Sequence, residues 1–152
     1  EIMEYSYGNL PNDRRHQIKG FGYYQAFQQV GFSASFVAES GRPKNCLGLY
    51  AGTGEDIYGG YNQFFYCDGK PTPRGSQGRL PWNYSLDLGV VYKPSALEGL
   101  AVRADVFNVM NTQRVLSMDE LHEDSSGKLP TYGRPLAYSS PRSVRLTVSY
   151  DF

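Results

Sequence analysis

Five segments of the chain alternate apolar and polar side chains over about ten residues each. They are residues 16–27, 30–38, 84–93, 100–109 and 143–152. Side chains along a β-strand point to opposite faces in turn, so this period of two predicts five strands, each with one apolar and one polar face. Both a soluble β-sandwich and a strand that faces lipid give such a pattern.

The connections between these segments are alternately short and long. Residues 39–83 and 110–142 are long connections, and residues 1–15 form a third loop before the first strand. Loops this long are uncommon in compact soluble domains, whereas outer-membrane barrels combine tight periplasmic turns with long extracellular loops. Strands of about ten residues, tilted, also span the apolar band of such a membrane. The pattern therefore favours an all-β, antiparallel transmembrane β-barrel, with the three loops outside the cell.

The polar faces of the predicted strands carry several charged residues. Among them are Asp87, Arg103, Asp105 and Arg145. These groups would be costly to bury in an apolar core, but they cost little where they face the wet lumen of a barrel or bulk solvent. The charges thus agree with a barrel wall without selecting it alone.

Composition and motifs exclude other classes of protein. Lys plus Arg and Asp plus Glu number 15 each, so the chain has no basic surface for nucleic acid. Its two histidines, His16 and His122, belong to no catalytic motif, and we predict no enzymatic activity and no cofactor. Four acidic residues could offer oxygen ligands to Ca²⁺, but they lack EF-hand spacing, and a solvated loop is the favoured interpretation. They are Asp119, Glu120, Glu123 and Asp124.

The first long connection contains both cysteines, Cys46 and Cys67. A disulfide between them suits an exported protein that passes through an oxidising compartment. A metal site is the alternative, but the sequence places no second Cys pair and no histidine beside them. We therefore predict a disulfide, which would close an ordered extracellular lobe.

The same connection is rich in aromatic residues. They are Tyr58, Tyr61, Phe64, Phe65 and Tyr66. Exposed aromatic side chains often mark binding surfaces, so these residues are candidate contacts for a ligand or a partner protein. They could equally pack the lobe on itself, and the sequence leaves both interpretations open.

Several stretches, taken in order, resemble the carboxyl-terminal end of TonB-dependent outer-membrane receptors, with the Oar-like group as the best match. They are NLPNDRRHQIKGFGYY from Asn9, GRLPWNYSLDLGVVYKP from Gly78, DVFNVMNTQ from Asp105 and SVRLTVSYDF from Ser143. The resemblance implies a 22-stranded barrel in the bacterial outer membrane, of which this chain forms about the last five strands. It also implies import of a scarce small ligand or peptide, energised by the TonB complex through an amino-terminal plug domain that this sequence lacks.

The carboxyl-terminal segment has a further role in barrels of this kind. The resemblance implies that a last strand with a terminal aromatic is read by the barrel-assembly machinery, and Val148, Tyr150 and Phe152 fit that signal. Phe152 would also serve as a lipid-facing aromatic at the membrane interface, which is compatible with this role. Two other functions remain open: a structural or adhesive barrel without energised transport, and a soluble β-sandwich binding module.

Overall fold

The computed structural model describes residues 3–50 and 63–152 and is all-β over these residues. None of the described residues lies in a helix that could cross a membrane. The chain divides into two compact units. One comprises Glu1–Arg15, Ser40–Pro81 and Val115–Tyr138, and the other His16–Glu39, Trp82–Arg114 and Ser139–Phe152.

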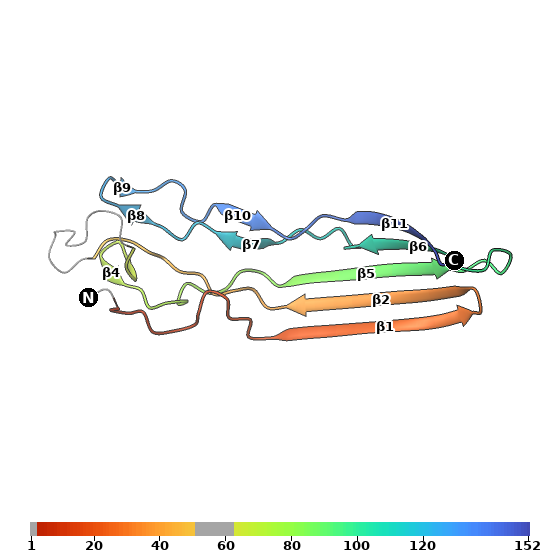
Figure 1. Ribbon diagram of the computed structural model, residues 1–152. Coiled ribbons are helices and arrows are strands. Elements are labelled where there is room, and N and C mark those ends of the chain that lie inside the picture. The colour runs from red at the N-terminus through yellow and green to blue at the C-terminus, as the bar shows by residue number, and fades with distance from the viewer. Residues whose placement is uncertain (1–2, 51–62) are drawn as a thin grey trace. The chain divides into compact units, whose positions relative to one another are not determined.

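The second unit is an antiparallel sheet of five strands, which can be followed in Figure 1. The strands are β1 (Gln17–Phe27), β2 (Val30–Glu39), β5 (Asn83–Tyr92), β6 (Leu100–Phe107) and β11 (Ser143–Tyr150). Their order is β1-β2-β5-β6-β11, so that β1 and β11 are the edges of an open sheet. The predicted antiparallel all-β class is confirmed, while the described residues form no closed barrel.

Each of the five strands of this sheet lies over one of the predicted segments, with differences at the ends. β6 ends two residues early because Asn108 adopts a φ of 49° and its side-chain amide donates to the carbonyl oxygens of Thr112 (3.0 Å) and Ser140 (2.9 Å). β11 ends at Tyr150 rather than Phe152, although the Asp151 N–H still donates to the Gly99 carbonyl at 3.0 Å. Local hydrogen bonds determine where these two strands end. The alternation of apolar and polar residues in the sequence does not reveal them.

The strand register assembles the apolar faces into one continuous surface. One row across the sheet pairs Gly22, Ala34, Leu88, Val106 and Val144. The next row on the same face pairs Tyr24, Phe32, Val90, Ala104 and Leu146. Side chains of these rows remain exposed, with Leu88 at 42% and Leu146 at 74%. We call this surface the apolar face; it spans all five strands.

The connections keep the predicted alternation of lengths. At one end of the sheet, residues 28–29 join β1 to β2 and residues 93–99 join β5 to β6. At the other end, residues 40–82 join β2 to β5, and residues 108–142 join β6 to β11. All long connections therefore leave the same end of the sheet.

The first unit contains short paired strands inside the segments predicted as loops. The pairs are β3 (Tyr66–Cys67) with β4 (Lys70–Pro71), β7 (Val115–Met118) with β10 (Pro135–Tyr138), and β8 (Glu123–Asp124) with β9 (Gly127–Lys128). This unit also holds most of the buried apolar side chains among the described residues, including Cys46, Phe64, Tyr66 and Leu80. The long loops are thus a folded body with a small core, while the sheet contributes only Ala38 to that set.

Candidate functional site

The two cysteines form a disulfide, Cys46–Cys67, as predicted. The alternative of a metal bound by both cysteines is wrong, because the two sulfur atoms are bonded to each other. Directly after Cys67, Asp68 and Gly69 have φ values of 50° and 67°, as the central residues of a type I′ hairpin turn do. The Asp-Gly pair is a hairpin signal in the sequence, although this segment was predicted as a loop without strands. We call the described residues 40–50 and 63–81 the disulfide lobe.

Backbone pairing joins the disulfide lobe to the loop between β6 and β11. The Leu47 N–H donates to the Glu120 carbonyl at 2.9 Å, and the His122 N–H donates to the Leu47 carbonyl at 2.7 Å. The Glu120 carboxylate accepts hydrogen bonds from the Asn45 backbone (3.1 Å), the Asn45 side chain (2.8 Å) and Arg42 Nη2 (3.1 Å). These bonds fix two loops that are far apart in sequence.

The four acidic residues of the second loop, considered from the sequence as Ca²⁺ ligands, have different partners in the structure. Glu120 is committed to Arg42 and Asn45, Asp119 Oδ1 accepts from the Leu121 N–H at 3.0 Å, and Asp124 Oδ1 accepts from the Ser126 N–H at 2.8 Å. Three of the four carboxylates thus bind protein donors, which leaves Glu123 with a different environment.

The amino-terminal segment belongs to the same unit. The Arg74 N–H donates to the Tyr5 carbonyl at 3.1 Å, and the Arg79 guanidinium pairs with Asp13 and donates to the Gly41 carbonyl at 3.0 Å. All three segments predicted as loops therefore contribute to one hydrogen-bonded body.

The aromatic candidates of the lobe fall into three groups. Tyr58 and Tyr61 lie outside the described residues. Phe64 and Tyr66 are 4% and 6% exposed, and the Tyr66 ring meets that of Tyr5 edge-on at 5.5 Å between centroids. For these two residues the burial and the ring contacts favour the packing alternative, and their contact with a ligand stays a prediction. Phe65 is partly exposed, with Arg74 Cζ 5.0 Å from its ring centroid.

The burial of Tyr66 has a measurable consequence. Burial first, and then the charge of Glu4, raises the pKa of Tyr66 from 10.0 to about 12. Between these values the native lobe keeps a proton that the unfolded chain loses, so the stability of the lobe falls as the pH rises from 10 to about 12. We expect the ultraviolet phenolate titrations of the wild type and Tyr66→Phe to differ by one group that ionises near pH 12. A difference centred near pH 10 would contradict the buried position.

The polar face of the sheet carries a charged cluster built from two neighbouring strands. Arg103 Nε on β6 donates to both carboxylate oxygens of Asp105, at 2.8 and 2.9 Å, and Arg145 Nη2 on β11 donates to Asp105 Oδ2 at 3.2 Å. Asp105 is only 4% exposed. A carboxylate so buried depends on its cationic partners, so the three residues act as one unit.

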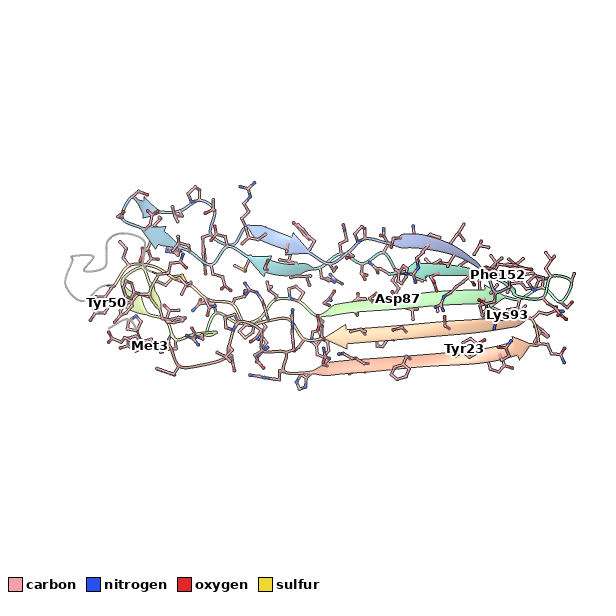
Figure 2. All side chains as sticks on the ribbon, viewed as in Figure 1. Met3, Tyr23, Tyr50, Asp87, Lys93 and Phe152 are labelled. Atoms are coloured by element: carbon pink, nitrogen blue, oxygen red, sulfur yellow. A yellow bond between two sulfur atoms is a disulfide. The ribbon has the colours of Figure 1, made fainter. Side chains whose placement is uncertain are left out.

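This cluster borders a shallow hollow on the polar face. The hollow has a volume of about 330 Å³, and its lining includes Tyr23, Ser33, Asp87, Gly89, Arg103 and Asp105. Figure 2 labels two of these side chains, Tyr23 on β1 and Asp87 on β5. A Cβ atom at Gly89 would lie 2.5 Å from both Asp105 Oδ1 and Ser33 Oγ, so glycine is needed to leave room for the carboxylate. Phe21 and Phe107 also line the hollow, which therefore combines charged and hydroxyl groups with aromatic rings.

The residues of the predicted assembly signal lie at the free edge of the sheet. Val148 and Tyr150 pair with Val102 and Leu100 and are 67% and 59% exposed. Phe152 follows the end of β11 and is fully exposed (Figure 2). Their exposure is compatible with recognition by another protein, and the role as an assembly signal stays a prediction.

Comparison with known proteins gives one informative match. The chain is 28% identical, over 190 aligned positions, to the TonB-dependent transporter Oar of Myxococcus xanthus. The alignment covers the whole of this chain but only 17% of that relative. No protein-family model matches the chain, and no solved structure matches it significantly. The similarity relates the chain to TonB-dependent receptors in general, and the relative is a transporter rather than an enzyme.

Proposed function

We propose that this chain forms about the last five strands of a 22-stranded barrel in the bacterial outer membrane, as part of a TonB-dependent transporter. The whole protein would carry a scarce small ligand or peptide across that membrane. Similarity to a TonB-dependent transporter over the full chain supports this proposal. The disulfide supports it too, because disulfides persist in exported proteins.

The observation that carries the proposal is the exposed apolar face. It runs across all five strands without interruption, and large side chains on it, such as Leu88 and Leu146, are exposed. Monomeric soluble proteins rarely leave a patch of this extent in water, whereas a barrel turns such a face toward lipid. The opposite face carries the Arg103–Asp105–Arg145 cluster, as suits a wet lumen.

The two ends of the sheet suit the two sides of an outer membrane. Short turns at one end are typical of the periplasmic side, and the long connections at the other end are typical of the outer surface. Tyr24, Phe32, Tyr92 and Tyr150 lie near the short-turn ends of their strands and are exposed. We assign them to the aromatic girdle at the periplasmic interface.

Energised transport would depend on a plug domain and on the TonB complex. By the similarity, the TonB complex acts through a plug domain upstream of these residues, and β11 is the strand that the assembly machinery receives. The disulfide lobe and its partner loops would lie where a ligand first meets the protein.

The test is the intact mass of the native polypeptide that carries this sequence, measured on the outer-membrane fraction. We expect a mass several times the 17.0 kDa of this chain, and binding of the full-length protein to purified TonB periplasmic domain. A polypeptide near 17.0 kDa, or one found only in the soluble fraction, would contradict the proposal. A large outer-membrane protein that does not bind TonB would instead favour a structural or adhesive barrel.

A further inference from the structure

Three potential metal ligands from two separate loops of the first unit meet beside the disulfide. His122 Nε2 lies 4.0 Å from Asp68 Oδ2, and His122 Nδ1 lies 3.8 Å from Glu123 Oε2. A single ion binds only one of the two ring nitrogens, and one ligand atom from each of the three residues can be chosen so that all lie within 4.8 Å of one another. An imidazole and two carboxylates form a donor set that suits first-row divalent cations.

The three residues are held in place by the surrounding fold. The backbone of His122 donates to Leu47 (2.7 Å) and accepts from the Leu129 N–H (2.8 Å), so it is fixed on both sides. Its ring lies edge-on to Tyr132, with 4.9 Å between centroids. Asp68 directly follows Cys67 of the disulfide, and Glu123 begins β8. Ligands fixed in this way need little rearrangement to bind an ion.

Protein contacts leave the imidazole incompletely satisfied. His122 Nδ1 is buried and has no hydrogen-bond partner among the described residues. Its distance of 3.8 Å to Glu123 Oε2 is too long for a hydrogen bond. That distance is somewhat longer than the roughly 3.4 Å between two ligand atoms of a tetrahedral zinc ion with bonds of about 2.0–2.2 Å, so both atoms can reach a shared cation with a small movement. A buried ring nitrogen that faces a carboxylate in this way is suited to share a cation with it.

The neighbouring residues leave one oxygen of Asp68 and the Glu123 carboxylate without a protein donor among the described residues. Lys128 pairs with Asp68 through Oδ1, which orients the carboxylate and keeps Oδ2 directed at His122. A Cβ atom at Gly48 would lie 2.7 Å from Glu123 Oε1, so glycine makes the room that the Glu123 carboxylate occupies. The side chains of Glu123 and His122 are 15% and 17% exposed, whereas Asp68 is half-exposed and would lie on the solvent side of a bound ion.

We propose that Asp68, His122 and Glu123 bind a divalent cation of the zinc class, with water completing its coordination. The ion would join the hairpin turn after Cys67 to β8, and so would link the disulfide lobe to the loop between β6 and β11. This inference rests on the geometry of the first unit alone and holds whether or not the protein transports a ligand.

The experiment is a calorimetric titration of the full-length protein, purified in detergent, treated with chelator and kept oxidised. We expect one saturable Zn²⁺ site whose affinity falls at least about ten-fold in His122→Ala and in Glu123→Gln. Asp124→Asn is the matched control, because it removes a neighbouring carboxylate that already binds Ser126. This control is expected to keep the affinity of the wild type.

X-ray absorption of the wild-type protein loaded with Zn²⁺ provides a measurement that does not depend on the variants folding. We expect nitrogen and oxygen scatterers only. Sulfur scatterers would overturn the assignment in favour of reduced Cys46 and Cys67. Absence of Zn²⁺ binding, binding of Ca²⁺ alone, or an equal loss in Asp124→Asn would also overturn it.

Discussion

Replacement of Ala34 by arginine is expected to destabilise the sheet by about 2–4 kcal/mol, whereas Ser35→Arg is expected to be tolerated. The two residues are neighbours in the middle of β2 and differ little in size. Ala34 lies on the apolar face and pairs with Leu88, while Ser35 lies on the polar face and pairs with Asp87. An arginine at position 34 would enter lipid, and one at position 35 would find a carboxylate opposite.

The measurement is urea unfolding of the full-length protein in lipid vesicles. Heat-modifiable mobility on gels reports the fraction of protein that is still folded. If the apolar face lay in water, the exposed Ala34 would accept arginine at little cost, since surface substitutions usually change stability by less than about 0.5 kcal/mol. Equal stability of the two variants would therefore contradict the assignment of the apolar face to lipid. A larger loss of stability for Ser35→Arg than for Ala34→Arg would mean that Ser35, and not Ala34, faces the lipid.

The strands of the sheet were predictable because each carries its own signal. Alternation over about ten residues defines both the strand and its two faces, and the short turns place neighbours together. Arg103 and Asp105 are two positions apart on β6, so the sequence places them on one face. Arg145 joins this cluster because the register of β11 against β6 pairs it with Asp105. No local pattern in the sequence specifies that register.

The folded state of the long connections was not predictable in the same way. β3, β4, β8 and β9 contain two residues each, and a two-residue strand has no period to detect. β7 and β10 are separated by a long insertion, so only tertiary pairing reveals them. The Asp68-Gly69 turn was a local signal that the sequence did offer.

The candidate cation site depends on contacts between loops that are distant in sequence. Histidine, aspartate and glutamate were all visible in the chain, yet His122 and Glu123 are far from Asp68 in sequence. The parallel pairing of Leu47 with Leu121 brings the two loops together and places His122 beside the disulfide. No histidine lies near the two cysteines in the sequence, which counted against a metal in this lobe. In the folded chain His122 lies beside them.

The disulfide is expected to be the main covalent support of the lobe. The variant Cys46→Ser, Cys67→Ser removes a link between residues 21 positions apart. In the chain-entropy model, closing a loop of this size contributes about 3 kcal/mol. We therefore expect the lobe to open roughly 100-fold more often in the variant, because each 1.4 kcal/mol is a factor of ten. Trypsin cleavage after Lys44 and Arg74 in the full-length protein measures this opening.

Two contacts set a limit on the effect of removing the disulfide. Gly48 and Phe64 exchange backbone hydrogen bonds of 3.0 and 3.1 Å, and Leu47 remains paired with the loop that carries His122. If these bonds were sufficient, the double-serine variant would resist trypsin as the wild type does, which would refute the prediction.

Wild-type protein treated with a reductant should match the variant. Heat-modifiable mobility should stay unchanged in both, since the five-stranded sheet belongs to the other unit and contains neither cysteine. Loss of that mobility would mean that the folded lobe is required for the sheet itself to persist.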